Sequence, residues 1–349
     1  MSATNDERRR DLITELFADG VPRLWCPLLT HYTSDGDIDR ARMAAHLGYV
    51  SRWVKGYLIP GSTGDGWELS GAESREVLGF ALEHARKAKL RLLVGVLKQD
   101  AEAARKEIAR TAASPGGSMP QSDARSQARH EPVCGYTVCP PTGRDLPQRE
   151  IRRAVTGVLE LGQPTALYQL PQVTQNEMSP DTIARLAKSF SNFYLFKDSS
   201  GADHVAQSAA PLGGVFLVRG AEGDYAEWLH ENGGPYDGLL LSTANCFPRE
   251  LHDIIAHSEQ EDTAAAGAIS SRLTSLVTSV FQLVSDLRDG NPFTNANKAM
   301  DHFFAHGAKA THVPPPRLHS GAILPTSVIQ QTGGLLRDHG FMPSKGYLE

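Results

Sequence analysis

The sequence of 349 residues has only four cysteines, Cys26, Cys134, Cys139 and Cys246. They form no Cys-x-x-Cys pair and no Cys/His cluster with the spacing of zinc ligands, so we expect neither a zinc site nor a disulfide scaffold. Reduced thiols are typical of a cytoplasmic protein. We therefore expect a cytoplasmic location.

Long apolar runs and an excess of positive charge are also missing. No stretch approaches the roughly 20 apolar residues that a membrane-spanning helix needs, and the polar residues 2–11 lack the apolar core of a signal peptide. The formal net charge of −5 argues against a nucleic-acid-binding surface. Arg8, Arg9 and Arg10 are flanked by acidic residues, and we expect them at the solvated start of a helix. The sequence thus predicts neither a membrane nor a nucleic-acid partner.

Short apolar runs alternate with longer amphipathic segments. Eight runs are typical of buried strands: Leu24–Thr30, Gly56–Pro60, Leu90–Leu97, Gly135–Cys139, Thr165–Tyr168, Phe193–Lys197, Val215–Arg219 and Gly238–Ser242. Helical patterns lie between them: Ile38–Val50, Ala72–Lys87, Ala101–Ala112, Gln148–Leu161, Pro180–Phe190 and Tyr225–Asn232. Ser70 with Glu73, Ser179 with Pro180, and Asp37 are expected helix-start signals.

Eight strand-then-helix units predict an α/β fold, a closed parallel (β/α)8 TIM barrel whose reactive groups gather at the carboxyl ends of the strands. An open doubly wound sheet is the alternative. Its dinucleotide-binding form carries a Gly-x-Gly-x-x-Gly turn after the first strand, and none follows Thr30 here. We therefore favour the barrel.

Beyond Pro248 the alternation stops and helical patterns follow at Ala264–Leu287, Asn297–Ala305 and Ser327–His339, broken by Asn291-Pro292 and by Pro314 to Pro316. We expect the barrel to occupy residues 1–255 and a C-terminal helical region to occupy residues 256–349. Residues 114–132 are rich in Ser, Gly, Pro, Gln and Arg and are expected to form an exposed or disordered insertion.

Lys197 ends the apolar run Phe193–Phe196 and precedes Asp198-Ser199-Ser200-Gly201. An amine walled by apolar neighbours loses hydration, which disfavours the ammonium form and leaves a nucleophile for carbonyl groups. A lysine that extends into solvent is the plain alternative. Tyr168 ends the preceding strand, and adjacent strands lie about 4.8 Å apart, so its phenol is expected within reach of the amine.

Gly61-Ser62-Thr63-Gly64-Asp65 follows the second strand directly. Two hydroxyls and adjacent backbone amides form a cradle that suits a carboxylate, although similar sequences form ordinary tight turns. Scattered histidines such as His31, His204 and His230 share no metal-ligand spacing, so we expect no metal.

With these motifs in order, the chain resembles the family of dihydrodipicolinate synthase and N-acetylneuraminate lyase, which are Schiff-base aldolases. The segment at 61–65 matches the family's Gly-Ser/Thr-Thr-Gly-Glu, Tyr168-Gln169-Leu170-Pro171 matches its Tyr-Asn-x-Pro, and Lys197 with residues 198–201 matches its lysine motif. Residues 35–39 and 242–245 match two further segments.

The resemblance implies a small-molecule 2-keto acid as substrate and no cofactor. Lys197 would form an imine with pyruvate or another 2-keto acid, Tyr168 would relay protons, and Ser62 and Thr63 would hold the carboxylate, with Thr63 also counted among the catalytic residues. Gly220 and Leu240 would offer backbone contacts, and Glu222 and Ser242 are candidate specificity contacts. The family also implies a homo-oligomer, either a tetramer or a dimer.

Departures from the family narrow this expectation. Val173 stands where dihydrodipicolinate synthases have an arginine, and Cys139-Pro140-Pro141-Thr142 stands where they supply a relay tyrosine. Asp65 and Gln169 each differ from the usual residue by one methylene. The predicted function is therefore a lyase or aldolase on pyruvate or a sugar-derived 2-keto acid, and not a true dihydrodipicolinate synthase. The alternatives are a sugar-acid dehydratase that uses the same imine and a catalytically weak keto-acid-binding paralogue.

Overall fold

Eight parallel strands form a closed barrel in the order β1 to β8, as expected for a TIM barrel. The computed structural model describes residues 3–113 and 131–349, so the expected insertion at 114–132 lies almost entirely outside the described residues. The strands are β1 (Leu24–Cys26), β2 (Gly56–Ile59), β3 (Arg91–Val96), β4 (Val133–Val138), β5 (Thr165–Gln169), β6 (Phe193–Asp198), β7 (Phe216–Arg219) and β8 (Gly238–Leu240). Each lies within one or a few residues of an expected run.

The described chain divides into two compact units made of discontinuous segments. The first unit comprises residues 1–23, 85–221 and 235–240, and the second comprises residues 24–84, 222–234 and 241–349. The expected boundary between a barrel at 1–255 and a helical region at 256–349 is a different division of the chain, and it stays a prediction.

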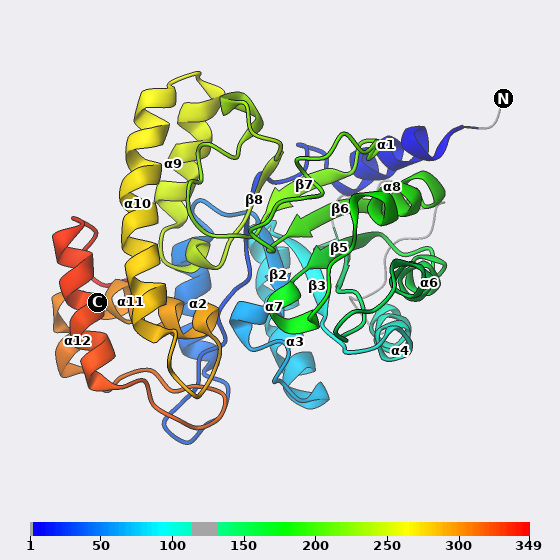
Figure 1. Ribbon diagram of the computed structural model, residues 1–349. Coiled ribbons are helices and arrows are strands. Elements are labelled where there is room, and N and C mark those ends of the chain that lie inside the picture. Colours follow the sequence, from blue (N-terminus) through cyan, green and yellow to red (C-terminus); the bar gives the residue numbers. More distant parts are fainter. Residues whose placement is uncertain (1–2, 114–130) are drawn as a thin grey trace. The chain divides into compact units, whose positions relative to one another are not determined.

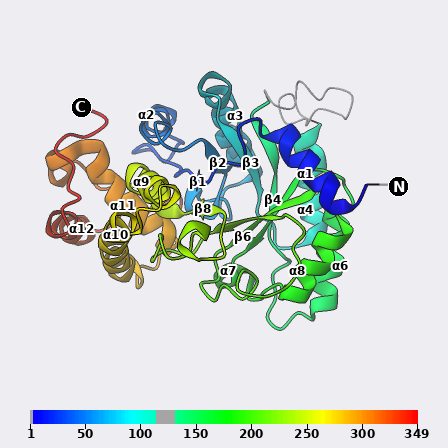
Figure 2. The same cartoon turned by 90° about the horizontal axis from the view of Figure 1, so that it is seen from above.

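The first unit holds strands β3 to β8 and the helices α1 (Asn5–Leu16), α4 (Ala101–Ala112), α6 (Gln148–Leu159), α7 (Pro171–Thr174) and α8 (Pro180–Ser189). Helices α4, α6 and α8 lie side by side on the outer face of the strands, where α4 contacts β3 and α8 contacts β6 (Figures 1 and 2). Strand β6 is buried at every position, because its inner face points into the barrel and its outer face lies under helices. Its residues are consequently apolar until Lys197.

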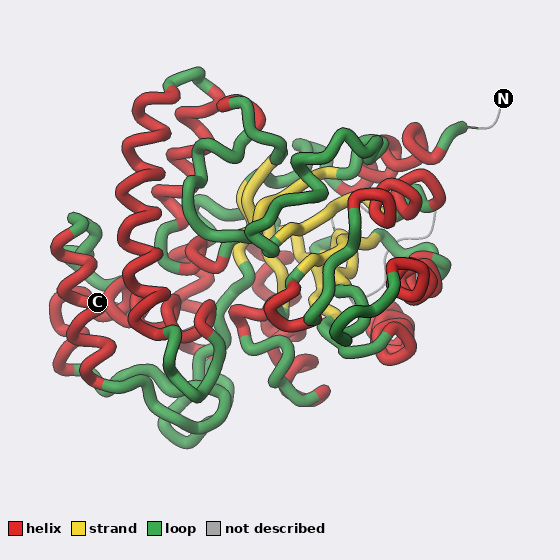
Figure 3. Tube along the Cα trace, viewed as in Figure 1, coloured by secondary structure: helices red, strands yellow, loops and turns green. Residues whose placement is uncertain are grey.

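The second unit holds β1 and β2 with the helices α2 (Arg40–Val50), α3 (Gly71–Ala88), α9 (Pro248–Glu259), α10 (Thr263–Val284), α11 (Pro292–His306) and α12 (Thr326–Asp338). Short 3-10 turns η1 (Ser62–Gly64), η2 (His230–Asn232), η3 (Ser242–Asn245) and η4 (Gly307–His312) complete it. Helices α9 to α12 pack against one another and appear as long red coils in Figure 3. Every residue of α11 from Thr294 to Ala305 is buried, as expected for a helix with neighbours on all sides.

Of the expected helix starts, two are confirmed and one is wrong. Ser179 caps α8 by accepting from the Thr182 amide, with Pro180 in the first turn. Ser70 and Glu73 exchange the reciprocal bonds of a capping box. For α2, however, the cap is Asp39 and not Asp37, since the Asp39 carboxylate accepts from the Arg42 amide.

Asn291-Pro292 separates α10 from α11, as expected, but α11 begins at Pro292 and not at the predicted Asn297. The Asn291 side chain accepts from the Thr294 amide at 2.9 Å, which caps α11, and Pro292 occupies its first position. The predicted helix at 225–232 is also wrong, because only the short turn η2 forms there. Gly234 approaches the Trp228 backbone so closely that a Cβ would lie 2.2 Å from the Trp228 carbonyl carbon. The chain therefore doubles back where a helix would have continued.

Arg9 corrects the expectation of a solvated helix start, because its side chain is fully buried in the first unit. Its guanidinium donates to the backbone carbonyls of Phe193 at 2.6 Å and Phe190 at 2.9 Å, and also to those of Ala187 and Gly213. A planar guanidinium with five donors can satisfy several carbonyls at once. Arg9 thus ties α1 to the ends of α8 and β6.

Candidate functional site

Lys197 and Tyr168 lie together in the first unit. They are direct neighbours in the β5–β6 register, so both side chains emerge on the same face of the sheet. Both are buried, with 4% and 2% of their surface exposed, and the Lys197 amine lies 3.9 Å from the centroid of the Tyr168 ring. The structure therefore brings together the predicted amine and phenol and keeps the amine out of bulk water.

Gly220 follows β7 and lies against the Lys197 stem. A Cβ at this position would lie 2.7 Å from Lys197 Cε and 2.0 Å from Ser199 Oγ. The Gly220 amide donates to the Asp198 carbonyl at 2.6 Å, and the Ser199 amide donates to the Gln169 carbonyl at 2.9 Å. A side chain at 220 would displace the lysine, so the requirement for glycine comes from close approach and not from an unusual backbone angle.

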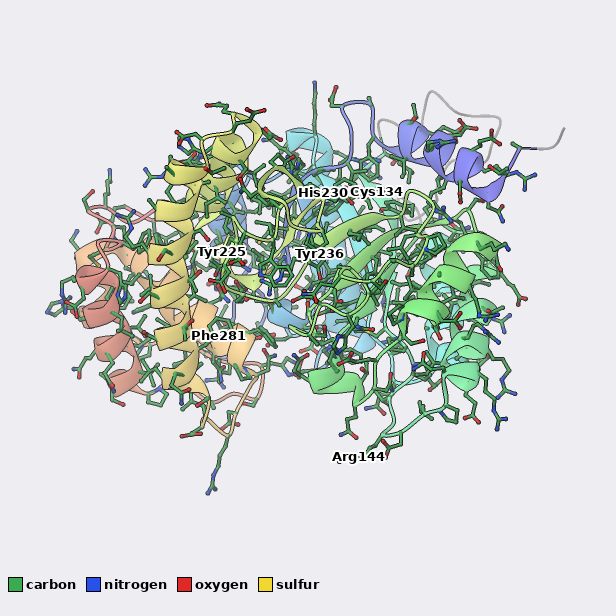
Figure 4. All side chains as sticks on the ribbon, turned by 45° about the horizontal axis from the view of Figure 1, so that its top comes forward. Cys134, Arg144, Tyr225, His230, Tyr236 and Phe281 are labelled. Carbon is green, nitrogen blue, oxygen red and sulfur yellow. The ribbon has the colours of Figure 1, made fainter. Side chains whose placement is uncertain are left out.

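A buried ion pair holds this part of the first unit. Asp203 accepts from Arg219 Nε at 3.3 Å and Nη2 at 3.2 Å, and from the Tyr236 hydroxyl at 2.5 Å; Figure 4 labels Tyr236. Arg219 immediately precedes Gly220 and also donates to the Ala221 carbonyl. The network fixes the end of β7, and with it the backbone of Gly220 beside Lys197.

Two residues near the amine were missed as candidates from the sequence. Ser199 Oγ is buried with no hydrogen-bond partner among the described residues, and it lies near Gly220 beside the lysine stem. Cys139 follows β4, whose last residue pairs with Leu167, so it is next in register beside Tyr168. Burial raises the pKa of the Cys139 thiol far above its usual range, and nearby Lys197 opposes that shift. Strand register was the signal that could have identified Cys139.

Gln169 and Asp198 follow Tyr168 and Lys197 as the next pair in the β5–β6 register, so their side chains point to the opposite face of the sheet. Burial raises the pKa of the Asp198 carboxyl, while the Ser200 amide and hydroxyl lower it by hydrogen bonding. The Gln169 side-chain oxygen accepts from the Met178 amide at 2.8 Å. Gln169, which replaces the family's asparagine, therefore anchors the segment that leads into α8.

In the second unit, the segment from Gly61 to Asp65 forms a tightly held turn, η1. The Thr63 carbonyl accepts from Thr294 Oγ1 at 3.0 Å, the Gly64 carbonyl accepts from Thr30 Oγ1 at 2.8 Å, and Ser62 Oγ accepts from Trp67 Nε1 at 3.0 Å. No hydrogen bond involves the Thr63 hydroxyl within the described residues. The backbone carbonyls of Thr63 and Gly64 thus accept hydrogen bonds from side chains elsewhere in the second unit, while the Thr63 hydroxyl can still donate one.

Asp65 ends this turn in the left-handed region, with φ of 61°. Its carboxylate accepts from the Tyr32 hydroxyl at 2.9 Å and from Lys298 Nζ at 3.3 Å. Lys298 also donates to the Arg317 carbonyl and lies 4.4 Å from the centroid of the Tyr32 ring. Burial lowers the pKa of Lys298, and Asp65 opposes that shift. The aspartate that replaces the family's glutamate is therefore an anchor to α11.

Glu222 and Ser242, both predicted as specificity contacts, lie together in the second unit and bind each other. Glu222 Oε1 accepts from the Ser242 hydroxyl at 2.6 Å and the Thr243 amide at 3.0 Å. Its Oε2 accepts from the Thr243 hydroxyl at 2.6 Å and from the hydroxyl of Tyr225 (Figure 4) at 3.1 Å. Four donors occupy the carboxylate, so its most direct role is to fix the turn η3.

Leu240 is the last residue of β8 and is buried; its expected backbone contact stays a prediction. Val173, in the position of the family's arginine, lies in α7. Within residues 3–113 and 131–349, no cluster of His, Cys, Asp or Glu side chains could hold a metal ion. None of the helices in the described part of the chain is long and apolar enough to cross a membrane.

A family model and two relatives with similar sequences point to the same family. Residues 117–287 match the model of the dihydrodipicolinate synthetase family. A 4-hydroxy-tetrahydrodipicolinate synthase of Agrobacterium fabrum is 26% identical over 272 residues, which cover 76% of this chain and 83% of the relative. The enzyme of the same name from Azoarcus is 29% identical over 261 residues, covering 71% and 79%.

Solved structures show the same fold at low identity. A prophage protein of the dihydrodipicolinic acid synthase family from E. coli K12, in complex with pyruvate, has a TM-score of 0.70 and 20% identity and covers 92% of this chain and 99% of its own. A variant of the 2-keto-3-deoxygluconate aldolase of Sulfolobus solfataricus, in complex with L-2-keto, 3-deoxy-galactonate, has a TM-score of 0.67 and 14% identity, covering 91% and 96%.

Proposed function

Because the chain belongs to the dihydrodipicolinate synthetase family, we propose that it is a class I lyase whose Lys197 forms a Schiff base with pyruvate or a sugar-derived 2-keto acid. The observation that carries this proposal is the buried Lys197 amine, 3.9 Å from the centre of the Tyr168 ring at the ends of β5 and β6. Two supports from the comparisons are a relative solved with pyruvate and an aldolase variant solved with a keto sugar acid.

The chemistry follows from the amine. The Lys197 nitrogen attacks the keto carbon of the substrate, the carbonyl oxygen leaves as water, and a protonated imine remains. This imine withdraws electrons from the bond between the third and fourth carbons. As the hydroxyl on the fourth carbon loses its proton, that bond breaks to give an aldehyde and an enamine. Protonation of the enamine and addition of water then release pyruvate and restore the amine.

Chain residues supply the other roles in the proposal. Tyr168 relays the protons that leave and return, because its phenol is the acid or base carried by the strand beside the amine. The hydroxyls of Ser62 and Thr63 hold the substrate carboxylate; the free Thr63 hydroxyl supports this assignment. Gly220 and Leu240 provide backbone contacts, and Glu222 acts on specificity through the position of Ser242 and Thr243.

A sugar-derived acid is favoured over an aldehyde that carries its own carboxylate. Val173 offers no charge where dihydrodipicolinate synthases have an arginine, so a second carboxylate would lack that cation. Loss of water instead of carbon–carbon cleavage would use the same imine, and product identification separates the two reactions. The weak-paralogue alternative rests on Cys139 and Pro140, which stand where a relay tyrosine is expected.

The direct test is chemical trapping. Protein incubated with pyruvate and then reduced with borohydride is expected to carry one reduced adduct, which peptide mass spectrometry places on Lys197. Lys298, an equally buried lysine, serves as the internal control and should stay unmodified. An unmodified Lys197 in folded protein would contradict the proposal, while adduct formation without turnover of any keto acid would favour the weak paralogue. Tyr168→Phe should trap more slowly.

The expected homo-oligomer, a dimer or tetramer, stays a prediction that light scattering would check. The expected cytoplasmic location likewise stays a prediction.

A further inference from the structure

A cavity of about 600 Å³ opens within the second unit, away from the residues assigned above. The end of α2, the start of α9, the middle of α10, the end of α11, residues 340–347 and Glu349 line it. Its walls include the rings of Tyr49, Trp53 and Phe341, and its cationic residues include Arg52, Arg272 and Lys345. Neither Lys298 nor any residue of the turn η1 belongs to this lining.

The aromatic wall is held in place by ring packing. The Tyr49 ring stacks on that of Tyr347 at 5.2 Å between centroids and meets the Trp53 ring edge-on at 5.8 Å. Phe247 packs edge-on against Phe341 at 5.1 Å. Such contacts restrict the rings to one arrangement, so a ligand would meet a largely formed surface.

The C-terminal segment that closes the cavity is also fixed. The Tyr347 amide donates to the Phe304 carbonyl at 2.9 Å, and its hydroxyl donates to Asp301 Oδ1 at 2.9 Å. A Cβ on Gly346 would lie 2.1 Å from the Ala305 carbonyl oxygen, so the chain passes this helix at closest approach. Residues 346 and 347 thereby hold the segment against α11.

The acidic residues of the cavity have partners of opposite charge, whereas, in the described part of the chain, three cationic residues of the cavity do not. Its two acidic residues have cation partners: Glu250 pairs with Arg249 at 2.9 Å, and Glu349 pairs with Lys309 at 3.4 Å. Arg52, Arg272 and Lys345 have no carboxylate partner among the described residues. The Arg272 guanidinium lies 4.5 Å from the centroid of the Phe341 ring, which holds it against the wall. The cavity thus combines flat apolar faces with uncompensated positive charge.

From this combination we propose that the cavity binds a planar ring that carries a carboxylate or a phosphate. The ring would stack on the Trp53 ring, since Arg272 already lies over the ring of Phe341. Arg272 and Lys345 would bind the anion, because a guanidinium matches both anions with parallel hydrogen bonds. Two classes of molecule share this chemistry, namely a nucleoside phosphate and an aromatic carboxylate. The inference does not depend on the reaction of Lys197.

Isothermal titration calorimetry with four probes tests it. Adenosine monophosphate and indole-3-acetate combine a ring with an anion, whereas adenosine offers the ring alone and inorganic phosphate the anion alone. One of the two combined probes is expected to bind at least about tenfold more tightly than either single-feature probe. The tighter of the two identifies the class, and its affinity should fall as salt is added.

Substitutions test whether the probe binds in this cavity. Arg272→Gln with Lys345→Gln should weaken the better probe by about tenfold or more. Arg153→Gln, an exposed arginine on α6 of the first unit, should leave it within a factor of about two. Both cavity side chains are exposed, so the variants are expected to fold. The inference is overturned if no combined probe binds with a Kd below about 1 mM, or if the double variant binds as well as Arg153→Gln does.

Discussion

Each compact unit has a buried lysine, Lys197 in the first and Lys298 in the second, and their surroundings differ. The Lys298 amine lies 3.3 Å from the Asp65 carboxylate and donates to a backbone carbonyl. The Lys197 amine lies over the ring of Tyr168. A carboxylate favours the ammonium form and commits it to an ion pair, which makes Lys298 an anchor. Burial alone therefore does not identify a nucleophilic lysine, and the neighbouring groups must be known.

A substitution of Lys197 tests the difference between the two lysines most directly. Lys197→Arg keeps a cation of similar length but removes the primary amine, so imine formation should be lost and turnover of the keto acid should fall by more than about 10³-fold. Borohydride trapping and initial-rate kinetics measure both effects. Circular dichroism checks that the variant is folded. Full activity in this variant would show that the chemistry does not pass through Lys197.

At Lys298 the expected loss is in stability. Lys298→Met leaves the Asp65 carboxylate buried without its cation, which should lower the free energy of unfolding by about 3–5 kcal/mol. Urea unfolding measures the change. Adding Asp65→Asn should recover part of it because the uncompensated charge disappears. If the double variant is no more stable than the single one, the ion pair is not the reason for the loss.

A substitution of Gly220 tests whether close packing beside Lys197 affects the rate of adduct formation. Gly220→Ala places a methyl group 2.7 Å from Lys197 Cε, so the rate of adduct formation should fall by about tenfold. Adding Ser199→Ala relieves the second clash and should restore part of that rate. Gly79→Ala on α3, where a Cβ meets nothing within 4 Å, is the matched control and should leave the rate unchanged. Equal rates in all three would remove the steric argument.

The smallest expected effect is a pH dependence of the second unit's stability. Burial lowers the pKa of His31 and His46, and it lowers that of His306 to about 4. The folded pKa values lie below the unfolded value of about 6.5, so the unfolded state binds more protons as the pH falls below about 6.5. Stability should therefore decrease from pH 6.5 toward pH 4. Urea unfolding across this range measures it.

His306→Gln should make this slope shallower, by at most about 1.4 kcal/mol per pH unit for one titrating group. His31 and His46, which pack against Asp301 and each other in one buried cluster, contribute to the remaining slope. His302 contributes as well, because burial also lowers its pKa. A slope that is unchanged in His306→Gln would rule out its contribution.

Much of the fold could be predicted because it depends on short-range patterns. The strand runs, the Ser179 cap and the Ser70–Glu73 capping box were all expected from local residue types. The helix at 225–232 was wrong because an amphipathic pattern does not reveal the close approach of Gly234 to Trp228. Arg9 was expected in solvent for a similar reason, since the carbonyls that it binds lie roughly 180 to 200 residues further along the chain.

The candidate site was partly accessible from sequence. Lys197 and Tyr168 end consecutive buried runs, so their contact followed from strand adjacency. Ser199 and Cys139 were missed because their interest comes from an unsatisfied hydroxyl and from strand register. Glu222 looked like a substrate contact, whereas its four internal donors are visible only after folding.

The sequence by itself determined the order of strands and helices and the position of each reactive residue along the chain, because periodicity, caps and strand ends are written in neighbouring residues. The tertiary structure alone decided which polar groups satisfy one another. Long-range contacts paired Lys298 with Asp65 and placed the Lys197 amine over the ring of Tyr168. They also left Arg52, Arg272 and Lys345 in the cavity of the second unit without a carboxylate partner among the described residues. The physical reason is that desolvation and pairing depend on what surrounds a group in space, and neighbours in sequence supply only part of that environment.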